Sequence, residues 1–469
     1  MRKTKKTDVL IIGGGPAGYP CAIRAAQLGL SVILVDKSGL GGTCLNRGCI
    51  PSKAVIHAAS RFAEITDHAA APAMGISCAK PKVDMKALSA WKDDLVGKLT
   101  SGVGMLLKSA GAEVLNGWAE FSDAKTCTVT LSDGKTVTIK AQNVVLATGS
   151  VEVELPFLPF SDERIISSTG ALELDKLPKT LAVVGAGYIG LELGIAFAKL
   201  GVKVSFIEAL DRILPLYDVA MTRPISRWLK THGVDMHLSS KAKGLSKTGI
   251  EFEDKDGKIQ EIAAEKILVA VGRKPVTQGW GLENMGVDMD GPFVCVDERC
   301  ATAMRGVYAI GDLIGEPMLA HKGTAQGEMV AEILAGHRAR FDPVAIPAVC
   351  FTEPEIVGVG QTPDEAKAAG EEVIIGKFPL AALGKALSMQ GGKDGGFVRV
   401  TARKGDHVIL GIHAVGAHVA ELSGEFALAL EMGARLEDIA GTIHVHPTLS
   451  EGFAESAMAA LGQPLHIKA

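Results

Sequence analysis

Residues 7–18 read TDVLIIGGGPAG. The apolar run before the glycines predicts a buried strand of a parallel sheet. An alanine-rich helical segment follows the turn, and a second apolar strand at residues 32–35 ends at Asp36. The glycines have the spacing G-x-G-x-x-G and lie at Gly13, Gly15 and Gly18. Strand, turn, helix and terminal acid together predict a Rossmann-type unit, in which the glycines admit a pyrophosphate to the helix start and the acid accepts from ribose hydroxyls.

The same pattern begins again near the middle of the chain. Residues 181–184 form an apolar strand, and a further strand at residues 202–207 ends at Glu208. The glycines between these strands repeat the spacing at Gly185, Gly187 and Gly190. The interval from the first glycine to the terminal acid is the same in both copies. An internal repeat of a whole unit predicts two bound dinucleotides.

Each copy closes with a strand and a glycine turn. Residues 144–150 close the first copy, and residues 267–273 close the second. We therefore expect an α/β fold with two dinucleotide-binding domains and a terminal region of mixed helices and strands. The expected boundaries are 1–150 for the first domain, 151–275 for the second, 276–345 for a part that completes the first, and 346–469 for the terminal domain. Within the first domain we expect one helical region at 54–110, strands at 128–131, 135–139 and 144–150, and then a linker at 151–159.

Directly after the first unit, residues 41–53 read GGTCLNRGCIPSK. Pro51 favours the first turn of a helix and therefore predicts a helix start near Cys49. A helix N-terminus and the nearby Lys53 both favour the thiolate, which is the reactive form of cysteine. Cys44 and Cys49 are therefore candidate catalytic residues.

Two other interpretations of these cysteines exist: unpaired buried thiols, or half of a zinc site. Cys295 and Cys300 form a second pair with the same spacing. The two pairs lie far apart in sequence, however, and neither has a histidine at ligand spacing. We therefore expect no metal.

Composition excludes several classes of function. The 469 residues are 47% hydrophobic and 22% charged, with a net charge of -4, which does not suggest a nucleic-acid partner. No run of about 18 apolar residues exists, so no membrane span is expected. Residues 1–6 are basic but lead directly into a strand, so we expect no signal peptide and a cytoplasmic location.

Near the end of the chain, two histidines flank a valine and precede Pro447. His446, with Glu451 five residues later, is a candidate acid–base pair. His444 is expected to be structural.

Together, these residues resemble the FAD-dependent pyridine nucleotide–disulfide oxidoreductases. The resemblance covers nearly the whole chain and depends on both glycine fingerprints and on four further segments: residues 41–53, 311–312, 318–322 and 446–451. It implies that the first domain binds FAD, that the second binds NAD, and that the terminal α+β domain forms a homodimer.

The resemblance also implies roles for single residues. The first fingerprint and Asp36 would hold the ADP half of FAD, although the family more often has glutamate at that position. Asp312 would contact the ribityl–phosphate region, and the helix start at Leu319 and Ala320 would face the flavin ring. Further FAD contacts are expected at Thr148 and Gly149. NAD contacts are expected at the second fingerprint, at Glu208 and at Gly272.

In the implied reaction, Cys44 exchanges with a dithiol substrate and Cys49 faces the flavin. Lys53 would pair with Glu192 near the flavin, and His446, oriented by Glu451, would act as the base. Among family members, the resemblance is to those that oxidise dihydrolipoamide with NAD⁺, whose partners are lipoylated carrier proteins of 2-oxoacid dehydrogenase or glycine cleavage complexes. The alternatives are a reductase of another disulfide and a non-catalytic flavin-bearing scaffold subunit.

Overall fold

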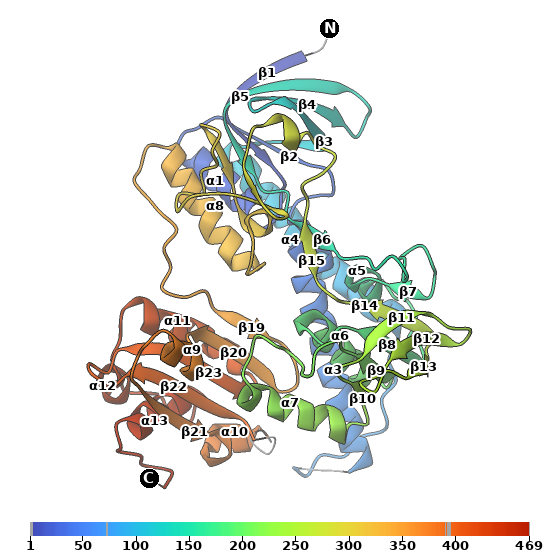
Figure 1. Cartoon of the computed structure of the whole chain (residues 1–469), viewed down its shortest axis with the longest axis vertical. Coiled ribbons are helices and arrows are strands. Elements are labelled where there is room, and N and C mark those ends of the chain that lie inside the picture. Colours follow the sequence, from blue (N-terminus) through green and yellow to red (C-terminus); the bar gives the residue numbers. More distant parts are fainter. Residues whose placement is uncertain (1–2, 72–73, 390, 392–394, 469) are drawn as a thin grey trace.

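The computed structural model of the chain describes residues 3–71, 74–389, 391 and 395–468. Its larger elements fall into three groups, each built on its own sheet (Figure 1). Within the described residues, no helix is long and apolar enough to cross a membrane.

The first group contains the first glycine turn. Its strands are β1 (Lys3–Ile12), β2 (Val32–Asp36), β3 (Glu113–Asp123), β4 (Thr126–Leu131), β5 (Thr136–Leu146) and β18 (Val307–Ala309). All neighbours pair in parallel except β4, which is antiparallel to both β3 and β5. Three helices cover one face: α1 (Gly18–Gln27), α4 (Met85–Ala110) and α8 (Ala320–Leu334). Because side chains alternate along β1, Val9 packs towards these helices and Leu10 towards the opposite face.

Two expectations for this group were wrong, and the strand β3 was not predicted. Residues 136–139 and 144–146 of the two expected strands belong to the single strand β5, because residues 140, 141 and 143 between them continue to pair with β1. Residues 147–149 lie in no strand. The helical region expected at 54–110 is two helices, α3 (Cys49–Ala70) and α4, and Asp84 caps the second by accepting from Lys86 N and Ala87 N.

The second group repeats the first around a fully parallel sheet, in the order β10-β9-β8-β14-β7. Its strands are β7 (Ile165–Ile166), β8 (Thr180–Val184), β9 (Lys203–Ile207), β10 (Asp235–His237) and β14 (Lys266–Val269). Its helices are α5 (Ser168–Leu172), α6 (Tyr188–Lys199) and α7 (Val219–Thr231). A separate antiparallel sheet follows, formed by β11 (Lys241–Leu245), β12 (Gly249–Glu253) and β13 (Ile259–Ala263).

Two connections tie the first group to the second. Helix α3 runs from the first group to the second, where Val55 and Ala59 join the core that contains α6 (Figure 1). The expected linker begins with β6 (Ser150–Glu152), which pairs antiparallel with β15 (Arg273–Pro275) as a two-stranded ribbon.

The third group is an antiparallel sheet in the order β19-β20-β23-β22-β21. Its strands are β19 (Ala348–Cys350), β20 (Glu355–Gly360), β21 (Val373–Pro379), β22 (Phe397–Arg403) and β23 (Ile409–Gly416). Its helices are α9 (Pro363–Ala368), α10 (Gly384–Ser388), α11 (Ser423–Glu431), α12 (Leu436–Gly441) and α13 (Glu451–Ala460). Thr362 and Glu365 form a capping box at the start of α9.

The smaller elements are α2 (Gly42–Arg47), β16 (Met289–Asp290), β17 (Phe293–Val294) and four 3₁₀ turns at Leu282–Asn284, Gly311–Ile314, Leu380–Ala382 and Val419–Leu422. The domain boundaries expected from the sequence remain predictions.

Candidate active site

The two glycine turns have the same local geometry. Gly13 and Gly185 have φ values of 104° and 102°, which side-chain-bearing residues rarely adopt. A Cβ atom at Gly13 would lie 2.1 Å from the carbonyl oxygen of Ala147, and one at Gly185 would lie 2.5 Å from that of Ala270. In each unit, the closing strand therefore requires glycine at the first position of the turn.

The terminal acids also occupy equivalent positions. Asp36 accepts hydrogen bonds of 2.7 Å from Gly14 N and from Ser38 N. Glu208 accepts from Ala186 N at 2.6 Å and from Leu210 N at 2.8 Å. These bonds hold each carboxylate beside its glycine turn, and each oxygen retains a lone pair with which it can accept from a ligand.

One cavity of about 500 Å³ contains most of the expected flavin and thiol residues. This volume lies within the range of small-molecule and cofactor sites. The expected residues that line it are Gly13, Gly15, Asp36, Cys44, Cys49, Lys53, Thr148, Gly149, Glu192, Asp312, Leu319 and Ala320. The expected residues outside its lining are Gly18, Gly185, Gly187, Gly190, Glu208, Gly272, His446 and Glu451.

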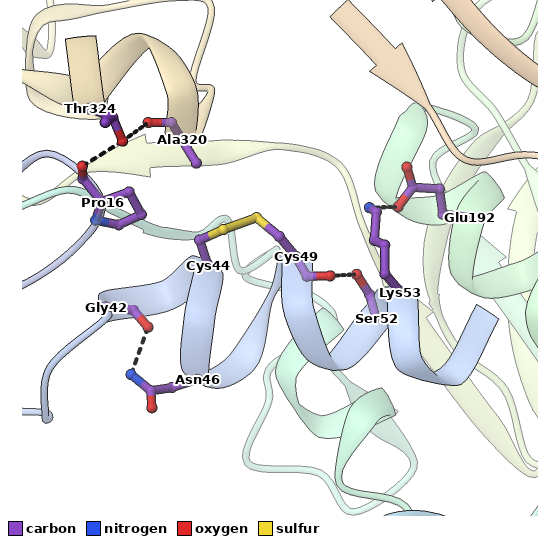
Figure 2. Close-up of a disulfide and its surroundings, with 10 residues drawn as sticks. All are labelled: Pro16, Gly42, Cys44, Asn46, Cys49, Ser52, Lys53, Glu192, Ala320 and Thr324. Atoms are coloured by element: carbon purple, nitrogen blue, oxygen red, sulfur yellow. Dashed lines mark hydrogen bonds and ion pairs between the residues drawn. A yellow bond between two sulfur atoms is a disulfide. The ribbon is translucent and has the colours of Figure 1, made fainter. Parts of the chain in front are cut away.

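The cavity residues fit a bound FAD. Helices α1 and α8 both begin at the cavity, and neither start has a side-chain cap, so their first N–H groups can face an anionic group. The two helix starts are tied together, because Thr324 Oγ1 donates to Pro16 O at 2.9 Å (Figure 2). Two carboxylates in the cavity lining, Asp36 and Asp312, can accept from ligand hydroxyls.

The cysteine pair forms a disulfide in the cavity wall. Cys44 lies in α2, and Cys49 is the first residue of α3. Their Cα atoms are 4.6 Å apart, and the two sulfur atoms are bonded (Figure 2). The helix start expected near Cys49 is confirmed. A thiolate released at this position would lie at the positive end of a 22-residue helix.

One turn further along α3, Lys53 pairs with Glu192 of α6. Lys53 Nζ donates to Glu192 Oε2 at 2.7 Å (Figure 2), and Glu192 is only 4% exposed. The other carboxylate oxygen accepts from Phe351 N at 2.9 Å, and Lys53 Nζ lies 4.5 Å from the centre of the Phe351 ring. Phe351 was not singled out in the sequence, where no motif marks it.

The second unit reaches this cavity through the first turns of α6. Tyr188, Ile189 and Leu193 line it together with Glu192. Burial raises the pKa of Tyr188 to about 12, so the phenol stays neutral at physiological pH. The cavity is therefore formed by both dinucleotide-binding units.

The expected acid–base pair forms away from this cavity. His446 Nδ1 and Glu451 Oε1 are 2.8 Å apart, and Glu451 Oε2 accepts from Thr448 N at 2.8 Å. Burial pushes the pKa of Glu451 upwards, but the bonds from Thr448 and His446 outweigh it, so the pKa is lowered. The His446 side chain is 80% exposed.

His444 contacts Glu425 Oε1 at 3.0 Å and Thr442 O at 2.9 Å, and its side chain is only 7% exposed. This environment is typical of the structural role expected for it. Cys300 is buried, and burial raises the pKa of its thiol to about 12. Among the described residues, no group of three or more His, Cys, Asp or Glu side chains is arranged to hold a metal ion.

Two family models match the chain. The model of pyridine nucleotide-disulphide oxidoreductases matches residues 7–327, and that of the dimerisation domain of these enzymes matches residues 346–457. The chain belongs to the pyridine nucleotide-disulphide oxidoreductase family. The fold class expected from the sequence is thereby confirmed, and the oxidoreductase uses FAD and NAD.

Curated relatives match the oxidoreductase over its full length. It is 53% identical to dihydrolipoyl dehydrogenase of Pseudomonas aeruginosa, with 100% of each chain covered. It is 43% identical to dihydrolipoyl dehydrogenase of Bacillus subtilis, with 98% of each chain covered. Among solved structures it is similar to LpdA from Mycobacterium tuberculosis, with a TM-score of 0.88 and 28% identity over 96% of this chain and 99% of that one.

Proposed function

We propose that this oxidoreductase oxidises dihydrolipoamide to lipoamide and reduces NAD⁺ to NADH, the activity for which its relatives in Pseudomonas aeruginosa and Bacillus subtilis are named. One observation carries the proposal. The Cys44–Cys49 disulfide and the Lys53–Glu192 pair line one cavity, together with the first glycine turn and the helix that begins at the second glycine turn.

The thiol chemistry follows from the disulfide. A thiolate of dihydrolipoamide attacks Cys44 Sγ, the Cys44–Cys49 bond breaks, and Cys49 leaves as a thiolate. The second lipoyl thiolate then attacks the lipoyl sulfur bound to Cys44 and displaces Cys44, so that lipoamide leaves as a disulfide and two electrons remain on the cysteine pair. FAD, when bound, carries these two electrons from the cysteine pair to the nicotinamide.

The proton steps require a base. His446 accepts the protons of the dithiol, because a histidine titrates near neutral pH. Glu451 holds the ring by its Nδ1 atom, which leaves Nε2 to accept the proton. Lys53, fixed by Glu192, keeps a positive charge in the cavity one helical turn from Cys49.

The position of His446 supports a homodimer. Within one chain, His446 is exposed and does not line the cavity with the disulfide. Around it, the matched dimerisation domain exposes apolar side chains, with Ile443 95% exposed and Val445 71% exposed. Leu428 and Met432 of the same domain are also exposed. If a second copy covers this surface, His446 of each chain would lie at the cysteine pair of the other chain, so that each site is built from both chains.

The other parts of the proposal concern partners and cofactor choice. Glu208 would accept from the adenosine ribose of NAD and repel the 2′-phosphate of NADP. The dithiol would arrive on a lipoylated carrier protein of a 2-oxoacid dehydrogenase or glycine cleavage complex in the cytoplasm.

The test is turnover of the purified FAD-loaded protein with free dihydrolipoamide and NAD⁺, followed as NADH absorbance. NADH formation that is lost in Cys44→Ser supports the proposal. Reduction of a different disulfide by a pyridine nucleotide, with no reaction of dihydrolipoamide, would identify a reductase of another substrate. A protein that binds FAD and turns over neither would be a scaffold subunit.

A further inference from the structure

The ribbon of β6 and β15 carries polar side chains into the flavin cavity. Ser150 and Glu152 come from β6, and Arg273 comes from β15, the strand that follows the closing turn of the second unit. Asp312, which lies in the 3₁₀ turn after β18, lines the same cavity. The ribbon therefore brings a cation of the second unit towards a carboxylate of the first.

A chain of hydrogen bonds joins these groups. Arg273 donates twice to Ser150, from Nε to Oγ at 2.8 Å and from Nη2 to the carbonyl oxygen at 2.7 Å. Ser150 Oγ then donates to Asp312 Oδ2 at 2.5 Å. The direction is fixed, because a guanidinium can only donate, so the single hydroxyl proton of Ser150 goes to Asp312. Ser150 is only 6% exposed, so water competes little for these hydrogen bonds.

We propose that Ser150 and Arg273 are positioning residues for FAD: they hold the Asp312 carboxylate in one orientation, so that the second unit contributes to the affinity of the first unit for its flavin. This inference depends on the assignment of the cavity to FAD in the proposed function. Neither residue needs to touch the reacting atoms. Ser150 accepts from the positively charged Arg273 and donates to Asp312. These hydrogen bonds set the orientation of the Asp312 carboxylate before FAD binds.

The test measures the affinity of the apoprotein for FAD by titration, with flavin fluorescence as the readout. Ser150→Ala removes one charge-assisted hydrogen bond from Asp312 and is expected to weaken FAD binding about tenfold. Arg273→Gln is expected to have a similar effect, because the Ser150 hydroxyl is then free to turn away from Asp312. Ser150→Thr retains the hydroxyl and is expected to bind FAD nearly as the native protein does.

Arg164 offers a matched control. Its Nε and Nη2 atoms donate to the Asp162 carboxylate at 3.2 and 3.1 Å, in the same unit as Arg273, but Arg164 does not line the cavity. Arg164→Gln should change FAD affinity less than twofold. Because Ser150 acts through Asp312, Ser150→Ala should have little further effect in an Asp312→Ala background.

FAD affinities of Ser150→Ala and Arg273→Gln within twofold of the native value would overturn the inference, as would additive losses in the double variant. If the Ser150→Ala apoprotein does not fold, the test uses the FAD affinities of Arg273→Gln, of Asp312→Ala and of the double variant that combines them. A native protein that binds no FAD would refute the cofactor assignment itself. A protein that binds FAD but does not oxidise dihydrolipoamide would refute the proposed substrate while leaving this inference standing.

Discussion

Lys53 and Glu192 form an ion pair across the two dinucleotide-binding units, with 2.7 Å between Nζ and Oε2. Lys53 belongs to the helix that begins at Cys49, and Glu192 belongs to the helix that begins at the second glycine turn. The terminal domain completes the arrangement, because Phe351 N donates to the free carboxylate oxygen of Glu192. One buried carboxylate thus connects all three groups of the fold.

The first prediction concerns this pair. Glu192→Ala should lower the free energy of unfolding by about 1–3 kcal/mol, because it leaves Lys53 and Phe351 N without their acceptor. Turnover should fall about tenfold or more, with FAD still bound. The checks are denaturant unfolding and NADH formation. The control is Asp94→Ala, which removes an exposed pair with Lys98 and should leave both quantities unchanged. Native turnover in Glu192→Ala would show that the pair has no role in the reaction.

The second prediction concerns the two sulfur atoms. Cys44→Ser should retain FAD and a long-wavelength absorbance from the Cys49 thiolate beside oxidised flavin, whereas Cys49→Ser should lack this band. Both variants should lose dihydrolipoamide turnover, because neither can form the disulfide. Absorption spectra of the purified variants test for this band. A band that persists in Cys49→Ser would reverse the roles of the two cysteines.

The third prediction concerns the pyridine nucleotide. The carboxylate of Glu208 is held beside the second glycine turn by Ala186 N and Leu210 N. The Glu208 carboxylate would repel the 2′-phosphate of NADP⁺, so kcat/KM should favour NAD⁺ over NADP⁺ by about 100-fold or more. Glu208→Gln should reduce the preference, and Glu251→Gln, an exposed change on β12, should not. Comparable kcat/KM values for the two nucleotides in the native protein would exclude this role.

The fourth prediction concerns acid stability. His413 is 4% exposed, and burial, with a further effect of the Arg399 charge, lowers its pKa to about 4. The unfolded chain binds a proton at this histidine near pH 6.5, whereas the folded chain does not. The contribution of His413 to the free energy of unfolding is therefore fully present above about pH 6.5. It is lost as the pH falls from 6.5 towards 4, and it changes little below pH 4.

The size of this loss is at most about 3 kcal/mol, from the difference between the two pKa values. Urea unfolding from pH 7.5 to 4 measures it in the native protein, in His413→Gln and in His57→Gln, which changes an exposed histidine of α3. The pH dependence should become smaller in His413→Gln only. An unchanged slope in that variant would mean that other groups cause the acid sensitivity.

The fifth prediction concerns the shared site. Co-expression of Cys44→Ser with His446→Gln should restore activity, because a mixed dimer contains one site with an intact cysteine pair and an intact base. Random assortment makes about half of the dimers mixed, so about a quarter of all sites should work. Each variant alone should be nearly inactive, because the thiol and the base act as a unit. Purified mixed dimers without activity above that of the single variants would place His446 in the site of its own chain.

The sequence predicted the parts of the site that local motifs encode. The glycine turns and the helix start at Cys49 depend on neighbouring residues, and the structure contains both. Asp36 and Glu208 lie beside their glycine turns, and their contacts with ligands remain predictions. Phe351 could not be found in this way, because its amide and ring reach Lys53 and Glu192 only after three separate groups have packed together.

The secondary structure shows one local signal that was missed and one limit of the same kind. The break between α3 and α4 was not predicted, although Gly75 and Pro81 precede Asp84, the residue that caps α4. In β5, residues 140–143 (Lys-Ala-Gln-Asn) interrupt the apolar pattern and indicate a break, but their pairing with β1 and β4 keeps them in one strand.

Helix α3 also constrains how the sequence can vary in length. Cys49 and Lys53 are four positions apart, so they lie on one side of the helix about one turn from each other. Inserting or deleting a single residue between them would rotate Lys53 by about 100° and turn it away from Glu192, even if every side chain were retained. Insertions after the helix ends at Ala70 would leave that angle unchanged. Relatives of this chain should therefore keep the spacing between the residues equivalent to Cys49 and Lys53 fixed, and any differences in length should accumulate beyond the end of α3.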